Sequence, residues 1–233
     1  MVRRIAALIR HADYQQLPDT PSAHQPFGLT DKGHIQAQHA ASSLQQALDR
    51  YNWSLSPTID SSPLLRAWQT AQVICQTLSG KLATIPEIAS YAELAERSLG
   101  SGNNLSIADI EALMRDDPRY GELPADWKSN SHYRLPLMGA ESLLQAGERV
   151  ANHLQQRMAD LANTSVIDTV QLFIGHGAAF RHAACQLQVL ELDQVASLSM
   201  YHAQPIYLEY LPNGQWRHIS GEWKVRTNEQ ATD

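Results

Sequence analysis

Two basic residues, Arg10 and His11, directly follow a short apolar run near the start of the chain. Residues 2–9 are predicted to form a strand buried in a parallel sheet. A neutral imidazole is a nucleophile, and a guanidinium binds phosphate through two parallel N–H groups. A strand end is also simply where a chain meets water, so other segments must decide whether this pair forms a site.

Similar groups follow two further predicted strands. The segment "SSPLLR" places Arg66 in the first turn of the helix after the second strand, and "IGHG" places His176 at the end of the last parallel strand. Gly177 then begins the next helix. Because ligands bind beyond the carboxyl ends of parallel strands, we expect these side chains at one sheet edge. Helix N-termini there add N–H donors that favour an anion.

This set of residues predicts phosphoryl transfer. Neighbouring arginines disfavour imidazolium and so lower the pKa of His11, which leaves the ring neutral and nucleophilic at pH 7. Arg10, Arg66 and His176 would hold the phosphoryl oxygens as charge develops. A leaving alkoxide needs a proton from a carboxylic acid. The segment "AELAERSLG" supplies two candidates, Glu93 and Glu96.

The order of predicted elements indicates the fold. Strand and helix alternate four times, which is typical of an α/β protein with a mostly parallel sheet covered on both faces, hence three α/β/α layers. We expect one domain over residues 1–225 and a flexible tail at 226–233. The predicted elements are a strand at 2–9, a helix at 31–51 capped by Thr30, a strand and helix within 57–80, a strand within 82–96, helices at 105–115 and 140–162, a strand and helix within 168–190, and strands within 197–219 with "PNG" as a turn.

An insertion at residues 101–140 is the least regular part of the chain. Its proline, aspartate, tryptophan and tyrosine content indicates loops, and we expect it to cover the mouth of the pocket. Tyr14, and Trp127 and Tyr133 within the insertion, are equally compatible with lining a substrate pocket and with anchoring a loop to a core.

Composition excludes several classes of protein. The 233 residues carry a formal charge of −6 and no lysine- or arginine-rich run, which argues against a nucleic-acid partner. No apolar stretch approaches the ~20 residues of a membrane span, and the first apolar run is too short for a signal peptide. Cys75 and Cys185 lie in no metal-ligand spacing, and we expect both to be reduced and buried on helices. We therefore expect a cytoplasmic protein without a metal or other cofactor.

Most of the ten histidines are expected to lie at the surface or to pack against neighbours. His176 and His182 are six residues apart on a turn and a helix, which is not a usual metal-ligand spacing. The histidines assigned to surface or packing positions are His24, His34, His39, His132, His153, His182, His202 and His218.

Five short motifs carry a resemblance to a known family. They are "IRHA", "SSPLLRAWQTA", "LAERSLG", "GAESL…ERV" and "IGHGAAFR". Their order and spacing resemble the histidine phosphatase superfamily, with the phosphoglycerate mutase-like fold, over roughly residues 4–187. His-Gly after the last strand resembles the mutase-type branch, whereas the acid phosphatase and phytase branch usually has His-Asp there.

The resemblance implies a role for individual residues. His11 becomes a phosphohistidine nucleophile, and the phosphate pocket is formed by Arg10, Arg66, His176 and Gly177. The family pattern L-x-E-R-x-x-G matches Leu94 to Gly100, which favours Glu96 as the acid and leaves Glu93 as its rival. Ser142, in "GAES", resembles a family position near the substrate. Asp13 and Glu93 are further possible substrate contacts.

Departures from the family pattern bear on the reaction. Ala12 replaces the usual glycine after Arg-His, and the chain continues with Asp13 and Tyr14 where mutases have an acid, tryptophan and asparagine. Lys128 and Ser129 follow Trp127 where mutases carry two arginines. These differences weaken binding of a bisphosphorylated sugar acid. They favour a metal-independent phosphomonoesterase acting on a small phosphorylated molecule; the alternatives are a phosphoglycerate mutase-type phosphotransferase and a non-catalytic phosphate-binding protein.

Overall fold

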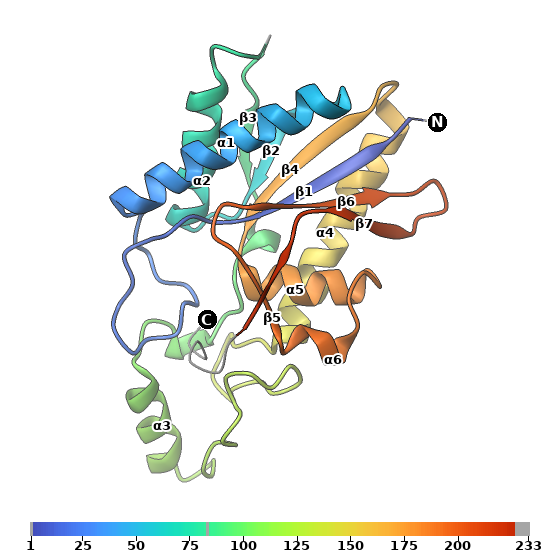
Figure 1. Ribbon diagram of the computed structural model, residues 1–233. Helices are drawn as coiled ribbons and strands as arrows, with labels where there is room; N and C mark the ends of the chain where they lie inside the picture. The colour runs from blue at the N-terminus through green and yellow to red at the C-terminus, as the bar shows by residue number, and fades with distance from the viewer. Residues whose placement is uncertain (1, 83, 227–233) are drawn as a thin grey trace.

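A six-stranded sheet forms the centre of the computed structural model, which describes residues 2–82 and 84–226 (Figure 1). The strand order is β3-β2-β4-β1-β6-β7. Neighbours within β3-β2-β4-β1 are parallel, whereas β6 runs antiparallel to β1 and β7 antiparallel to β6. The strands are β1 (Arg4–Arg10), β2 (Ser54–Ser61), β3 (Glu87–Ser90), β4 (Thr169–Gly175), β6 (Pro205–Tyr210) and β7 (Trp216–Ser220). The predicted α/β class and mostly parallel sheet are confirmed.

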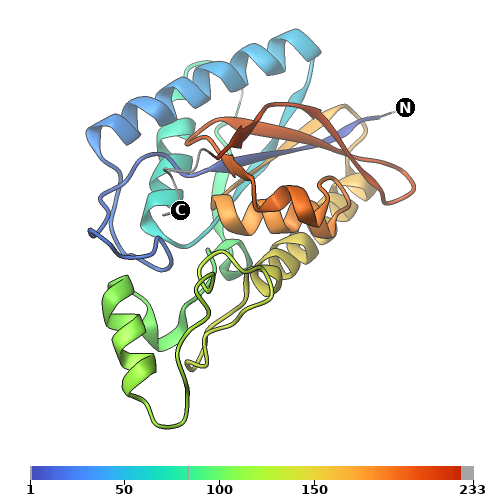
Figure 2. The same cartoon turned by 60° about the horizontal axis from the view of Figure 1, so that its bottom comes forward.

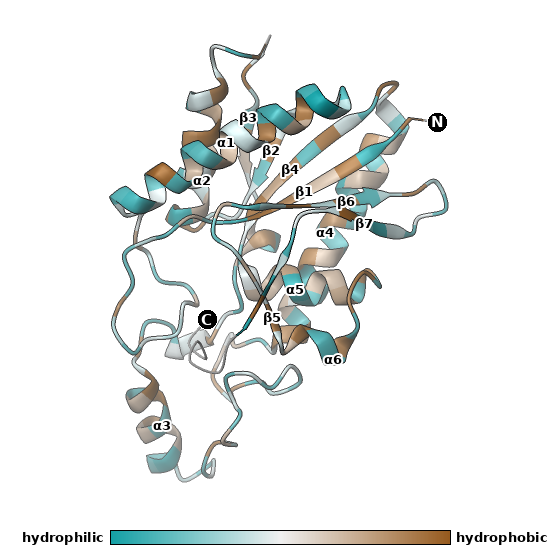
Figure 3. Ribbon diagram, viewed as in Figure 1, coloured by the Kyte–Doolittle hydropathy of each residue, from teal (hydrophilic) through white to brown (hydrophobic). Residues whose placement is uncertain are grey.

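Helices cover both faces of this sheet and complete the three predicted layers (Figure 1). Helices α1 (Asp31–Tyr51) and α2 (Leu65–Leu78) share one core cluster with the sheet, and α4 (Leu143–Thr164) and α5 (Gly177–Gln186) share a second. Most residues of β1 and β4 are accordingly apolar (Figure 3). Burial on both faces requires such continuous apolar strands.

The insertion lies at the end of the molecule below the sheet (Figure 2), where its apolar residues form a small third core together with Ala23 and Leu99. It contains η2 (Gly100–Gly102) and α3 (Ile107–Asp116), and Ser106 begins α3 with a capping box. Trp127 is 2% exposed and donates its Nε1–H to Glu111 at 3.2 Å. Its aromatic ring therefore anchors the insertion.

The remaining elements are short. They are η1 (Ala92–Leu94), α6 (Leu192–Val195), and a two-stranded sheet of β5 (Leu198–Met200) and β8 (Trp223–Val225). Thr30 caps α1 as predicted, because its side chain accepts the N–H of Gly33 at 3.0 Å. Cys75 is buried, but Cys185 is partly exposed on α5, so the expectation that both are buried is wrong for Cys185.

Two expectations concern the ends and surfaces of the molecule. Within residues 2–82 and 84–226, no helix has the length and apolar character needed to cross a membrane. Of the predicted tail, Arg226 is described and donates its main-chain N–H to Ser197, whereas residues 227–233 lie outside the described part.

Candidate active site

The carboxyl ends of β1, β2 and β4 are joined by main-chain hydrogen bonds. The N–H of His11 donates to Gly175 at 2.9 Å, and that of Ser62 donates to Ile174 at 2.8 Å. The chain just before β6 joins the same edge, where the N–H of Ala203 donates to the carbonyl of Arg10 at 2.9 Å. The side chains that follow these strands are therefore held at a common edge, as the sequence predicts.

His11 lies in this edge with its ring almost completely buried, at 1% exposure. Its ring centroid is 5.1 Å from that of His176 and 5.2 Å from that of Tyr14. Nδ1 lies 2.8 Å from the carbonyl oxygen of Ala12, which can only accept, so Nδ1 carries the hydrogen. Burial and the nearby Arg66 hold the pKa of His11 well below its ordinary value. The ring is therefore neutral at pH 7, with the lone pair on Nε2.

Arg66 connects the site to the loop that precedes α1. Its guanidinium is fully buried and donates to the carbonyls of Gln25 at 2.8 Å, Ser22 at 2.8 Å and Ala23 at 2.7 Å. It also lies 4.6 Å from the ring centroid of Tyr14. Burial lowers the pKa of Arg66, yet an arginine remains charged at pH 7. One cation thus fixes both the loop and the tyrosine beside His11.

His176 is the residue that precedes α5, and its ring is 1% exposed. Nδ1 lies 3.3 Å from Arg66 Nη2, and Nε2 lies 2.8 Å from Ser62 Oγ. Burial, followed by the charge of Arg66, holds the pKa of His176 well below its ordinary value. The imidazoles of His11 and His176 are therefore both neutral at pH 7.

Arg10 and Gly177 border a small pocket beside His11. Arg10 Nη1 donates to the carbonyl of Met200 at 3.0 Å. A Cβ atom at position 177 would approach Arg10 Cδ to 3.2 Å, so the glycine allows the arginine stem to pack closely against the start of α5. Of the four predicted phosphate-binding residues, Arg10 and Gly177 line this pocket, whereas Arg66 and His176 contact each other and do not line it.

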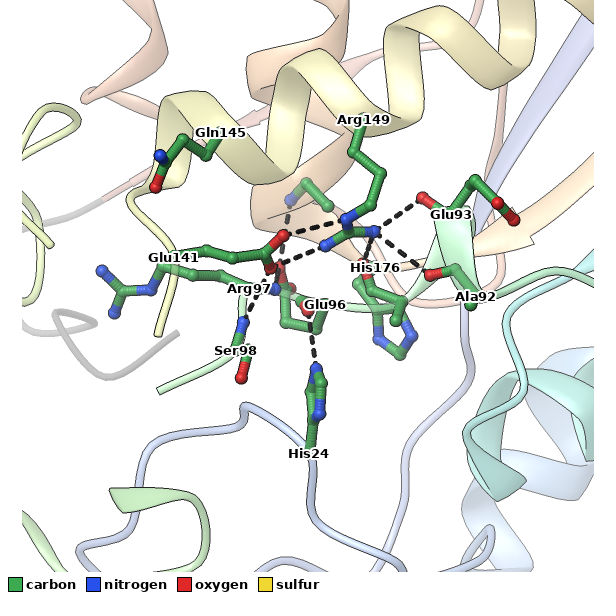
Figure 4. A network of polar contacts seen from close by, with 12 residues as sticks. His24, Ala92, Glu93, Glu96, Arg97, Ser98, Glu141, Gln145, Arg149 and His176 are labelled. Carbon is green, nitrogen blue, oxygen red and sulfur yellow. Dashed lines mark hydrogen bonds and ion pairs between the residues drawn. The ribbon is translucent and has the colours of Figure 1, made fainter. Parts of the chain in front are cut away.

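Glu96, rather than Glu93, lines this pocket. Figure 4 shows both residues with their polar contacts. Glu96 Oε1 accepts the N–H groups of Arg97 at 2.8 Å and Ala179 at 3.2 Å. Glu93 is exposed; its carbonyl accepts Arg149 Nη1 at 2.7 Å, while its carboxylate points away from His176. Of the two candidate acids, the structure therefore brings one to His11.

Asp13 contacts the residue that caps α1, Ser142 itself caps α4, and neither lines the pocket beside His11. Asp13 Oδ2 accepts the hydroxyl of Thr30 at 2.7 Å. Ser142 caps α4, where its Oγ accepts the N–H of Gln145 at 3.1 Å. The Asp13 carboxylate therefore binds the side chain that caps α1, and the Ser142 hydroxyl binds the backbone at the start of α4.

His202, expected at the surface or in packing, instead lies with its ring centroid 5.5 Å from that of His11. The reason is strand direction. Because β6 is antiparallel to β1, Pro205 at its amino end pairs with Ile9 near the carboxyl end of β1. The residues just before β6 therefore lie at the same sheet edge as the carboxyl ends of the parallel strands. A prediction that β6 is antiparallel to β1 would have placed His202 in the site.

A larger cavity of about 380 Å³ adjoins the pocket beside His11. The two share Ser22, Glu96, Ala178 and Arg181 as lining residues. The cations around the larger cavity are Arg97, Lys128, Arg181 and Arg226.

Arg97 is the most unusual of these cations. It is 9% exposed, and within the described part of the chain its guanidinium has no hydrogen-bond or ion-pair partner. Burial lowers the pKa of Arg97, and the negative charges of Glu96 and Glu141 partly offset this effect.

His182 lines the same cavity, and burial lowers its pKa to about 4. Among residues 2–82 and 84–226, no group of three histidine, cysteine or acidic side chains is placed to hold a metal ion.

Comparisons with known proteins agree with this geometry. The family model of the histidine phosphatase superfamily (branch 1) matches residues 6–220. A mycobacterial glucosyl-3-phosphoglycerate phosphatase has a similar structure, with TM-score 0.68 and 19% identity, covering 97% of this chain and 100% of the other. A search of curated proteins gave no match.

Two further structures have the same fold. A putative alpha-ribazole-5'-P phosphatase from Escherichia coli gives TM-score 0.66 and 16% identity, covering 97% of this chain and 100% of the other. A phosphoglycerate mutase from Bacillus anthracis gives TM-score 0.70 and 15% identity, covering 94% of this chain and 93% of the other. With a family model that spans nearly the whole sheet and its helices, the chain belongs to the histidine phosphatase superfamily.

Proposed function

We propose that the protein is a metal-independent phosphomonoesterase that works through a phosphohistidine on His11. The observation that carries this proposal is the setting of His11: its ring is 1% exposed and its Nδ1 lies 2.8 Å from a carbonyl oxygen, which leaves the lone pair on Nε2. Arg10 and Glu96 border the same pocket. This arrangement supplies a nucleophile, a cation and an acid around one small space.

The reaction has two steps. The Nε2 lone pair of His11 forms a bond to phosphorus while the ester P–O bond breaks, and the leaving oxygen takes its electron pair and a proton from Glu96. Glu96 then accepts a proton from water as the water oxygen bonds to phosphorus and the P–N bond breaks. The electron pair returns to His11, and inorganic phosphate leaves.

Phosphate binding requires a rearrangement around Arg66. The pocket beside His11 has a volume of about 10 Å³, which is about the space of one water molecule. Arg66 donates to three carbonyls of the segment 22–25. We infer that phosphoryl oxygens replace some of these carbonyls as acceptors, since a guanidinium favours an anionic acceptor over a neutral one.

Hydrolysis and mutase activity differ in the acceptor of the phosphoryl group. We expect release of inorganic phosphate from p-nitrophenyl phosphate in the presence of EDTA, and negligible interconversion of 2- and 3-phosphoglycerate in a coupled assay. Rapid interconversion with little hydrolysis would support the mutase alternative. A protein that binds phosphate but turns over no member of a phosphomonoester panel would be the non-catalytic alternative.

The larger cavity suggests the chemistry of the leaving group. Arg97 is a buried cation without a partner among the described residues, and Lys128 on the insertion side of the cavity also lacks one there. An unpaired buried charge is costly. A substrate with a second anionic group, a carboxylate or another phosphate, would pair with these cations while its phosphomonoester lies beside His11.

Substitution of Arg97 tests this substrate class. We expect Arg97→Met to lower the ratio of kcat/KM for 3-phosphoglycerate to that for p-nitrophenyl phosphate by about 10- to 100-fold, the loss expected for a charge-assisted hydrogen bond. Fructose 1,6-bisphosphate is the second test substrate, because its second anionic group is a phosphate in place of the carboxylate of 3-phosphoglycerate. Arg119→Met is the matched control, because Arg119 is exposed and paired with Asp117. An unchanged ratio with both substrates would exclude the anionic leaving group.

A further inference from the structure

Ser62 is a buried residue of the site that the proposed steps do not use. It is 0% exposed and follows the last residue of β2. Its N–H is fixed by Ile174, and its Oγ lies 2.8 Å from His176 Nε2. Oγ also accepts the N–H of Leu64 at 3.3 Å. The hydroxyl is therefore held in place by the chain on both sides.

The partners of His176 determine which of its nitrogens carries the hydrogen. Nδ1 faces Arg66 Nη2, and a guanidinium has donors only, so Nδ1 must be the acceptor of this contact. In the neutral ring the hydrogen is then on Nε2, which donates it to Ser62 Oγ. The opposite tautomer would place two donors against each other at Arg66.

We propose that Ser62 is a positioning residue: its hydroxyl oxygen accepts Nε2–H of His176 and so holds Nδ1 beside Arg66, where both can contact a phosphoryl oxygen. This inference rests on the proposed phosphomonoesterase activity. A phosphoryl oxygen next to Nδ1 receives a hydrogen bond only from the protonated ring. His176 thus gains a proton as the anion binds, and Ser62 remains an acceptor for the charged ring.

This protonation occurs among several charged or titratable neighbours. The groups that face His176 are Arg10 at the end of β1, His11 directly after it, His24 in the loop before α1, Arg66 on α2, Arg149 on α4, and Glu96, which accepts an N–H at the start of α5. Most of these groups oppose a positive ring, so a bound phosphoryl anion and the Ser62 oxygen are what favour it.

The test compares Ser62→Ala with Ser61→Ala. Ser61 is also 0% exposed, but its hydroxyl donates to the main-chain carbonyl of Ser62 at 2.9 Å and contacts neither the Ser62 hydroxyl nor His176. We expect Ser62→Ala to lower kcat for p-nitrophenyl phosphate by about 10- to 100-fold, because a buried N–H loses its acceptor. The alkaline limb of the pH profile should move to lower pH, since the protonated ring loses a stabilising oxygen. Ser61→Ala should keep the wild-type profile.

Nuclear magnetic resonance separates this inference from the activity. In protein labelled with ¹⁵N-histidine, the His176 signals, assigned with a His176→Asn variant, should show hydrogen on Nε2 and should change in Ser62→Ala but not in Ser61→Ala. An inactive wild-type protein with these signals would refute the phosphatase and retain the Ser62–His176 hydrogen bond. Unchanged signals, kcat and pH profile in Ser62→Ala would overturn the positioning role.

Discussion

His11→Ala is expected to reduce the hydrolysis of p-nitrophenyl phosphate by about 10⁴-fold or more, because removal of a nucleophile that forms a covalent intermediate costs losses of this order. The residue is 1% exposed and its neutral ring has its lone pair on Nε2, the nitrogen that attacks phosphorus in the proposed mechanism. Initial rates measure the loss. A brief reaction with ³²P-labelled substrate should also label the wild-type protein with an acid-labile phosphate that is absent in His11→Ala.

The control for this prediction is His34→Ala. His34 is exposed on α1, and its replacement should leave both turnover and labelling unchanged. Thermal unfolding of both variants checks that the fold is retained. Turnover by His11→Ala within tenfold of the wild type would contradict the proposed mechanism.

Glu96→Gln is expected to produce the second largest loss, and the size of the loss should depend on the leaving group. General acid catalysis contributes about 10²- to 10⁴-fold when the leaving oxygen is a strong base. We therefore expect a loss in this range for glycerol phosphate, an alkyl ester. For p-nitrophenyl phosphate, whose leaving group needs little protonation, formation of the phosphohistidine should be much less affected, and single-turnover release of p-nitrophenol measures that step.

Glu93→Gln serves as the matched control, since it makes the same change three residues away on an exposed carboxylate. Its kinetics should match the wild type for both substrates. Equal losses for the two esters in Glu96→Gln would mean that Glu96 does not protonate the leaving group. A larger loss in Glu93→Gln would reverse the assignment of the two acids.

The sequence allowed prediction of the residues that the sheet itself positions. Arg10, His11, Arg66 and His176 each follow a parallel strand, and the carboxyl ends of such strands must meet. The alternation of strands and helices likewise predicted the three layers. These inferences needed only the direction and burial of strands, which apolar patterns indicate well.

Features that depend on loop packing were beyond this reasoning. Nothing in the local sequence indicates that Arg66 binds three carbonyls of a loop about forty residues earlier in the chain. The rule for parallel strands alone does not predict that His202 lies in the site, because His202 comes just before an antiparallel strand, β6. For Ser142, however, the pattern Ser-x-x-Gln is a capping-box signal, and it indicates the helix start that the structure shows.

The separate core of the insertion bears on how such a protein changes its substrate. Trp127, Ile110 and Met114 pack together apart from the two clusters that hold the sheet. Four of the residues that line the larger cavity belong to this insertion: Ile107, Lys128, Ser129 and Ser131. These four can therefore be exchanged between relatives while the imidazoles keep their places. We expect a chimaera that carries residues 101–140 of a relative to show that relative's preference for the alcohol part of the phosphate ester. The reaction at phosphorus should stay that of the present protein.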